Sequence, residues 1–469
     1  MVFSSLTFLY AFLPLVLLVT FVAPRSARNA LLLAASLLFY AWGERGYVLL
    51  MLGSIALNYV AGLVVDRRRG RGTERAVLLL FVGANLALLA AFKYANFAVD
   101  NANALLGLEL ELAPVHLPIG ISFFTFQALS YLVDVHRGEA RAQRNPLNVA
   151  LYVSMFPQLV AGPIVRYHDV ARQITRRVVT RAGFALGIRR FVVGLGKKIL
   201  LANVLGRLAD EAFALEAAEL SGPVAWAGVV AYAFQIYFDF SGYSDMAIGL
   251  GHMLGFRFLE NFRHPYVARS LQDFWRRWHV SLSTWFRDYL YVPLGGNRVA
   301  PWRVYLNLFT VFFLCGLWHG ASWNFALWGL LHGTFLVLER LGLGRVLVRL
   351  PRAVGHAYTL LVVLLSWVLF RAETLTASGV HLSAMFLGGA PDALPLSTFL
   401  DRELALAFLV ALFASTPIAA AIGRRMALDT ERQAFGPGLL RLGTLAGVFA
   451  CTLLYLVAGT FDPFIYFRF

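Results

Sequence analysis

Residues 3–23 read FSSLTFLYAFLPLVLLVTFVA, an apolar run of 21 residues without a charged side chain. A transmembrane helix needs about 20 predominantly apolar residues to cross the hydrocarbon core of a bilayer, so this run can span it. A cleavable secretory signal begins with a basic region, and nothing before Arg25 is basic. We therefore predict that the sequence opens with a membrane-spanning helix and not with a signal peptide.

Apolar runs recur along the whole chain. Hydrophobic residues make up 59% of it and charged residues 14%, against roughly 25% charged residues in soluble proteins, which excludes an ordinary soluble domain and a disordered chain. Lipid cannot satisfy exposed backbone groups, and the runs are too long for barrel strands, so each crossing should be helical. We predict an all-α integral membrane protein with about ten to twelve crossings, formed as a single domain over residues 1–469. The further runs are 30–42, 47–65, 76–99, 117–135, 148–165, 183–206, 223–253, 304–317, 322–339, 356–370, 403–423 and 438–460.

The connections between these runs alternate in charge. Loop 66–75 carries five arginines, whereas connection 100–116 carries three acidic residues and no lysine or arginine. Basic loops remain on the cytoplasmic side of a membrane, which predicts a multi-pass membrane protein whose N-terminus lies outside the cytoplasm. For a bacterial protein this means the inner membrane and a periplasmic N-terminus. The formal net charge of +15 then reflects basic loops that face anionic lipid. No nucleic-acid-binding motif is present, so we expect no nucleic-acid partner.

Two stretches do not fit a simple series of crossings. Run 148–165 has basic segments on both sides and contains Pro157, Gly162 and Pro163, which predicts a segment that enters the membrane and returns on the same side. Run 304–317 has 14 residues, or about 21 Å of helix against a hydrocarbon core of ~30 Å. The sequence therefore predicts a helix too short to cross and places His319 at membrane depth, within a hairpin over residues 304–339.

Segment 270–298 has the pattern of an amphipathic helix. Its apolar side chains recur at positions i, i+3, i+7, i+10 and i+14, which is one helical face. We predict one continuous interfacial helix with aromatic anchors, and a membrane-surface strut is the structural alternative. His279 lies beside this stripe, where a histidine is either structural or part of a site. The stripe consists of Trp275, Trp278, Leu282, Trp285 and Tyr289.

Histidines within the apolar runs are candidates for chemistry. A buried, neutral imidazole at His319 can take a proton from a hydroxyl group, and a hydrogen bond between helices is the structural alternative. No acid or second histidine lies three or four residues from His319, so we expect no metal site. Cys315 and Cys451 are interpreted as packing residues, and His332 is a weaker catalytic candidate. Asp239 and Asp245 lie about 240° apart around a helix, which favours structural roles over a paired-carboxylate mechanism.

Five motifs carry a resemblance to a known family. The sequence resembles the membrane-bound O-acyltransferase superfamily, and within it the bacterial alginate O-acetyltransferase branch. The resemblance implies a helical bundle around a tunnel, with its catalytic half at about residues 223–345. It further implies that His319 is the catalytic histidine and that His279 is the second histidine of the site. The motifs are MVFSSLTFLYAFLPL at 1–15 with LLLAASLLFYAWGE at 31–44, YFDFSGYSDMAIGLGHMLGFRFLENFRHPY at 237–266, FWRRWHVSLSTWFRDYLYVPLGG at 274–296, CGLWHGASWNFALWGLLHG at 315–333 and FDPFIYFRF at 461–469.

The resemblance also implies the substrates. We expect acetyl-CoA as the acyl donor, with an acyl carrier protein as the alternative, and no permanently bound cofactor. Arg276, Arg277 and Arg287 are candidates for binding the donor phosphates at a cytoplasmic mouth. The acetyl group is expected to pass to a periplasmic partner acetyltransferase and then to an exported polysaccharide such as alginate. The alternative is a transporter or scaffold subunit of a polysaccharide-export complex that performs no acyl transfer itself.

Overall fold

The computed structural model describes residues 1–419, 421–422 and 435–459, so the terminal motif at 461–469 lies outside the described residues. These residues form helices and no β-strand, which confirms the predicted all-α class. Within the described ranges, four helical stretches are long and apolar enough to cross a membrane, and two shorter apolar helices lie at Phe8–Val22 and Leu375–Leu387. The chain is therefore a polytopic membrane protein, and the number of crossings stays a prediction. The four stretches are Tyr47–Arg68, Glu74–Lys93, Arg352–Arg371 and Gly438–Val457.

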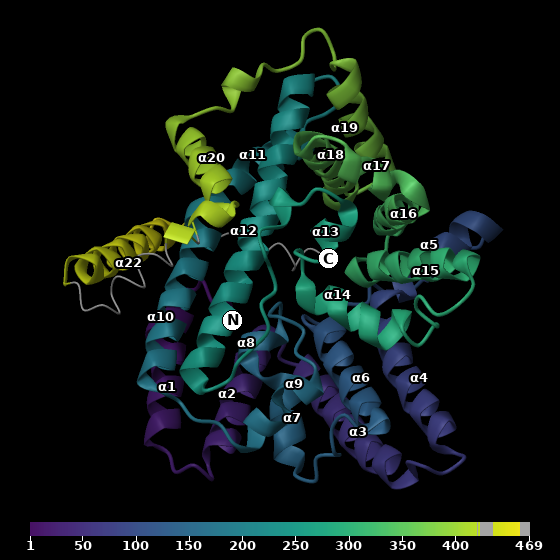
Figure 1. The fold of residues 1–469 in the computed structure, drawn as a ribbon, viewed down its shortest axis with the longest axis vertical. Coiled ribbons are helices and arrows are strands. Elements are labelled where there is room, and N and C mark those ends of the chain that lie inside the picture. The colour runs from purple at the N-terminus through teal and green to yellow at the C-terminus, as the bar shows by residue number, and fades with distance from the viewer. Residues whose placement is uncertain (420, 423–434, 460–469) are drawn as a thin grey trace. The chain divides into compact units, whose positions relative to one another are not determined.

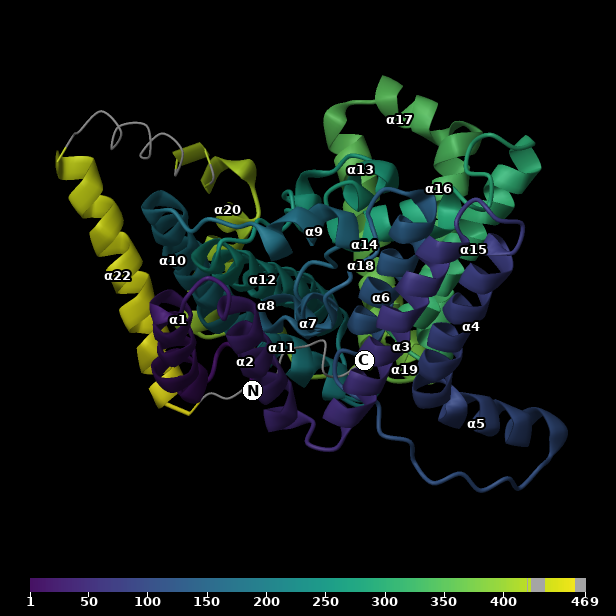
Figure 2. The same cartoon turned by 90° about the horizontal axis from the view of Figure 1, so that it is seen from below.

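The chain forms two compact units. The first unit comprises residues 1–191 and 246–259. Helices α3, α4 and α6 pack against one another in it, and α2 packs on α7 (Figure 2). The α6 side chains are almost all buried, which makes this helix the core of the unit. The helices of the unit are α1 (Leu13–Val22, after a π-helical turn at Phe8–Phe12), α2 (Arg28–Gly43), α3 (Tyr47–Arg68), α4 (Glu74–Lys93), α5 (Ala95–Leu106), α6 (Ile121–Arg137), α7 (Pro146–Ser154), α8 (Phe156–Leu159) and α9 (Tyr167–Thr175).

The segment predicted to enter and return is a broken helix in this unit. Helix α7 has nine residues, or about 13 Å of rise, and it stops at Met155 before the single turn of α8. The backbone after α8 is irregular as far as Arg166, and every side chain from 148 to 165 is buried. This confirms that the segment is no continuous crossing helix. Its irregular backbone is enclosed by protein, as a lipid environment requires.

The second unit comprises residues 192–245 and 260–469. Its most extensive helix contact joins α15 and α16, which form a hairpin, and α18 packs on α16 (Figure 1). The hairpin helices can approach closely because Gly316 and Gly329 carry no Cβ atom. At either position a Cβ atom would collide with a backbone carbonyl of the facing helix. The helices are α11 (Asn203–Ala214), α13 (Leu271–Trp275), α14 (Val280–Phe286), α15 (Pro301–His319), α16 (Trp323–Leu338), α17 (Gly344–Arg349), α18 (Arg352–Arg371), α19 (Leu375–Leu387), α20 (Arg402–Ala414) and α22 (Phe435–Val457), while α10 (Arg181–Gly196) and α12 (Gly222–Leu254) contribute to both units.

Helix α15 is longer than the sequence predicted. It has 19 residues, or about 28 Å of rise, and it ends at His319. The prediction of a 14-residue helix is wrong because polar residues interrupted the hydropathy without ending the helix. Arg303 is exposed, and the Asn307 amide donates to the Leu294 carbonyl oxygen at 3.2 Å. Pro301 stands in the first turn, where its missing N–H is no loss.

The prediction of one continuous interfacial helix within residues 270–298 is also wrong. The segment consists of α13, α14 and a π-helical turn at Arg287–Tyr291, with a break between the first two pieces. His279 stands at the break with φ of 43°. The side chains of Trp275, Trp278 and Trp285 are buried within the protein. The aromatic stripe therefore packs inside the unit and does not anchor a helix in the bilayer surface.

The two aspartates of α12 take part in separate ion pairs. The Lys198 ammonium lies 2.8 Å from the Asp239 carboxylate, and the Lys197 ammonium lies 2.7 Å from Asp245. Both lysines come from the π-helical segment Lys197–Ala202. Each carboxylate thus has its own lysine partner, which agrees with the structural interpretation of both residues.

Candidate active site

His319 is the last residue of α15 and lies in a cage of aromatic rings. Its ring centroid is 4.9 Å from that of Trp318, 5.1 Å from Trp328 and 5.1 Å from Phe370. Helices α15, α16 and α18 each supply one of these rings, and only 5% of His319 is exposed. The following residue, Gly320, ends the helix in an extended conformation. A Cβ atom there would meet the Phe325 ring, so this position requires glycine.

His279 lies between α13 and α14 and is completely buried. Its left-handed φ of 43° is uncommon for a residue other than glycine, and such strain persists only where the surroundings enforce it. The Phe240 ring of α12 meets the imidazole edge to face, with centroids 4.6 Å apart. The Nδ1 atom lies 3.0 Å from Oδ1 of Asn261. Burial lowers the pKa of the His279 imidazole, which keeps this ring neutral near pH 7.

One indole ring joins the two histidines. The Trp318 centroid is 6.4 Å from that of His279 and 4.9 Å from that of His319. Two residues that are 40 positions apart in the sequence are thus brought into one aromatic cluster. Two buried imidazoles in one apolar cluster can accept and hold a proton away from bulk water, which is the requirement for general-base chemistry on a hydroxyl group.

The weaker candidate His332 belongs to the same cluster but has a structural partner. Its Nδ1 atom accepts a hydrogen bond from the Trp275 indole N–H at 3.3 Å. The ring is fully buried, and its centroid is 4.9 Å from that of Trp328. These contacts favour a packing role that links α13 to α16.

The three arginines predicted to bind the donor lie around α13 and α14. Arg276 and Arg287 are exposed. Arg277 pairs with Asp273 at 2.8 Å, and Arg287 pairs with Asp288 at 2.7 Å. Both pairs are near the protein surface, where an ion pair contributes about 0–1 kcal/mol, so an incoming phosphate can compete for these guanidinium groups. Their role in binding the donor stays a prediction.

Comparison with known proteins assigns this sequence to a family. The sequence profile of the membrane-bound O-acyltransferase family matches residues 74–378, a range that contains His279, His319 and their aromatic neighbours. The chain belongs to this family.

Three relatives illustrate its range. Over the full length of both chains, the protein is 42% identical to the probable alginate O-acetylase AlgI of Pseudomonas putida. It is 38% identical to the peptidoglycan O-acetyltransferase of Helicobacter pylori, over 81% of this chain and 78% of that relative. It is 28% identical to the teichoic acid D-alanyltransferase of Bacillus subtilis, over 46% of this chain and 58% of that relative.

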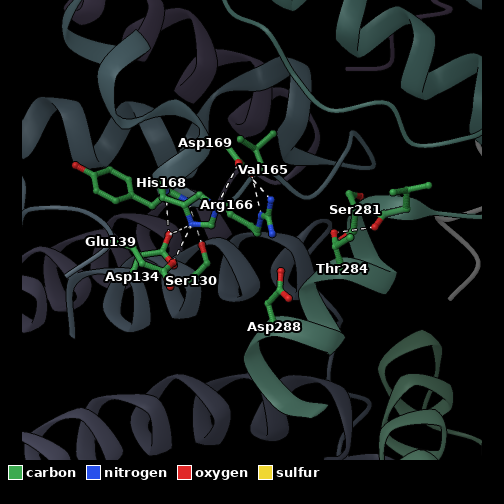
Figure 3. Close-up of polar contacts among 12 residues, drawn as sticks. Ser130, Asp134, Glu139, Val165, Arg166, His168, Asp169, Ser281, Thr284 and Asp288 are labelled. Atoms are coloured by element: carbon green, nitrogen blue, oxygen red, sulfur yellow. Dashed lines mark hydrogen bonds and ion pairs between the residues drawn. The ribbon is translucent and has the colours of Figure 1, made fainter. Parts of the chain in front are cut away.

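A second polar cluster lies in the first unit of this O-acyltransferase-family chain. The imidazole of His168 on α9 lies between two carboxylates (Figure 3), with Nδ1 2.9 Å from Asp134 and Nε2 3.3 Å from Asp169. Arg166 also pairs with Asp169, at 2.9 Å. The sequence does not reveal this cluster, because Asp134 and His168 are 34 positions apart and form no short motif.

The same cluster includes a group of potential metal ligands. One ligand atom each from Asp134, Glu139 and His168 lies within 4.8 Å of the others. The backbone N–H of His168 also donates to the Asp134 carboxylate at 2.9 Å. Because the imidazole already bridges two carboxylates, the arrangement is that of a protonated histidine in an ion-pair network, and we assign no metal to it.

Stability should fall at alkaline pH because of His168. Hydrogen bonds to Asp134 and then Asp169 raise its pKa to about 10, from roughly 6.5 in the unfolded chain. A raised folded-state pKa stabilises the fold fully below pH ~6.5, and that contribution is lost as the pH rises toward 10. We expect the melting temperature of the detergent-solubilised protein to fall over this window, and to fall less in His168→Gln. His356→Gln is the control, and an equal pH dependence in His168→Gln and wild type would contradict the assignment.

Proposed function

We propose that this chain is an O-acetyltransferase that takes an acetyl group from acetyl-CoA at the cytoplasmic side of the inner membrane. The group passes to a periplasmic partner acetyltransferase and from there to an exported polysaccharide. The observation that carries the proposal is the pair of buried histidines about Trp318, in a chain that aligns end to end with a protein named a probable alginate O-acetylase. The relative named peptidoglycan O-acetyltransferase supports the same chemistry on another exported glycan.

The proposed reaction uses His319 as a general base. The oxygen of an acceptor hydroxyl forms a bond to the acetyl carbonyl carbon while His319 takes the hydroxyl proton. The carbon–sulfur bond of the thioester then breaks, and the proton leaves with the coenzyme A thiol. His279, whose ring also lies beside the Trp318 indole, orients the acceptor or shares its proton. This direct transfer needs neither a covalent acyl-enzyme nor a nucleophilic serine or cysteine.

The topology supplies the direction of transfer. The proposed orientation has a periplasmic N-terminus and basic loops in the cytoplasm. The charged body of coenzyme A cannot enter lipid, so it stays at the cytoplasmic mouth, where Arg276, Arg277 and Arg287 can bind its phosphates. Only the acetyl-thioester end has to reach the histidine pair inside the unit.

Radiolabelled donor distinguishes this enzyme from a transporter or a scaffold. Membranes that contain the protein, its periplasmic partner and the polysaccharide are supplied with acetyl-labelled coenzyme A. An enzyme moves the label into the partner or the polymer, and membranes without the protein do not. Export of polymer without any transfer of label would show that the chain is a transport or scaffold subunit. Supplying the label on an acyl carrier protein in a parallel reaction identifies the donor.

A further inference from the structure

Asn261 is the centre of a buried hydrogen-bond network around His279. It lies in the irregular segment between α12 and α13 and is 1% exposed. Its backbone carbonyl accepts from the Val280 N–H at 2.9 Å, so it holds the chain immediately after the left-handed residue. Its side-chain Nδ2 donates to the Ser244 hydroxyl of α12 at 3.0 Å. Asn261 therefore ties the break between α13 and α14 to helix α12.

The oxygen and nitrogen of the Asn261 amide are assigned by a backbone group. The Ser281 N–H can only donate, and it lies 3.2 Å from Oδ1 of Asn261. The Ser281 hydroxyl donates to the same oxygen at 2.9 Å. If the amide were turned over, its NH₂ group would face the Ser281 N–H, and two donors would meet in a buried site. The atom beside Ser281 is therefore the carbonyl oxygen.

This assignment determines which imidazole nitrogen of His279 carries the proton. Nδ1 of His279 lies 3.0 Å from the same Asn261 oxygen, which can only accept. An unprotonated Nδ1 would point its lone pair at the lone pairs of that oxygen. Nδ1 must therefore donate, and in the neutral ring the lone pair lies on Nε2. Nε2 is buried and has no hydrogen-bond partner among the described residues.

We propose that Asn261 is a positioning residue that holds His279 in the Nδ1–H tautomer, so that Nε2 accepts a hydrogen bond from the acceptor hydroxyl during acyl transfer. This inference rests on the proposed function, because it assumes that His279 takes part in the reaction. The rings of Phe240, Phe262 and Trp318 surround the imidazole. Burial in these surroundings lowers the pKa of His279, which favours the neutral ring.

Two substitutions separate positioning from packing. Asn261→Leu keeps the volume but removes the acceptor, and it should lower the transfer rate at saturating donor by about 10²-fold with little change in KM. Asn261→Asp keeps the acceptor and should retain at least about one tenth of the rate. Its carboxylate raises the pKa of His279, so the acidic limb of its pH–rate profile should move to higher pH. A purely structural Asn261 would leave that limb in place.

The matched control is Asn307→Leu. This buried asparagine of the same unit donates a hydrogen bond to the Leu294 carbonyl oxygen at 3.2 Å. Its loss should keep the transfer rate within about threefold of wild type. Equal losses in Asn307→Leu and Asn261→Leu, with unchanged pH profiles, would overturn the positioning role. If wild type moves no label at all, the proposed function fails instead, so the two failures are distinguishable.

A direct measurement removes the dependence on variants that fold poorly. Nitrogen-15 NMR of histidine-labelled wild type and His279→Asn isolates the His279 signals by difference. The proposal expects a neutral ring with the proton on Nδ1 near pH 7. A proton on Nε2, or a charged ring, would overturn it even if every Asn261 variant were inactive.

Discussion

His319→Ala is expected to lower acetyl transfer by about 10²–10⁴-fold while the affinity for acetyl-CoA stays nearly unchanged. The size of the effect is that of a lost general base. The affinity should persist because His319 lies among the rings of Trp318, Trp328 and Phe370, where it would contact the acetyl end of the donor and not the nucleotide. The measurement is a pair, namely acetyl-CoA binding and the transfer rate at saturating donor, on purified wild type and variant.

Two further variants show whether the loss comes from chemistry or from packing. His319→Phe retains a ring in the aromatic cage but has no basic nitrogen, so it should be as inactive as His319→Ala. His356→Ala removes a half-buried histidine of the same unit whose Nδ1 lies 3.2 Å from the Ala268 carbonyl oxygen, and it should keep the rate of wild type. Normal transfer in either His319 variant would remove this residue from the mechanism. Lost affinity with a normal rate would make it a binding residue and direct the search for the base to His279 or His332.

The sequence predicted what depends on local composition. Long apolar runs such as 47–65 became helices of membrane-spanning length, because lipid permits few other structures. The prolines and glycine of run 148–165 indicated a broken segment, and the structure has one. The candidates His319 and His279 came from the resemblance, since spacing alone left structural alternatives open for both. In the structure both histidine rings lie beside the Trp318 indole, which agrees with their assignment to one site. Their catalytic roles stay predictions.

The error at 270–298 arose because side-chain periodicity continues through a change in the backbone. Trp275, Trp278 and Trp285 keep a helical spacing and are all buried, although the break at His279 separates the first two from the third. A periodicity argument cannot detect a single left-handed residue, whose conformation is enforced by contacts that are distant in sequence. The Asn261 network is invisible for the same reason, because it joins α12, an irregular segment and the start of α14.

His279→Ala is expected to lower transfer by about 10²-fold, and His279→Asn should be milder. The geometry gives two separate reasons for this order. Asparagine can donate a side-chain N–H to Oδ1 of Asn261, whereas alanine leaves that acceptor without the bond that His279 provides. Asparagine also adopts left-handed backbone angles more readily than alanine, which meets a penalty of roughly 1–2 kcal/mol there.

His279→Gly separates these two reasons. Glycine adopts a φ of 43° without strain, so this variant should melt at a higher temperature than His279→Ala although both lack the imidazole. If the imidazole carries the function, transfer is equally low in the glycine and alanine variants and partly retained in the asparagine variant. If His279 only supports the break between α13 and α14, glycine restores transfer along with stability. Melting temperature and transfer rate, measured on the same three preparations, therefore decide whether the left-handed histidine belongs to the chemistry or to the fold.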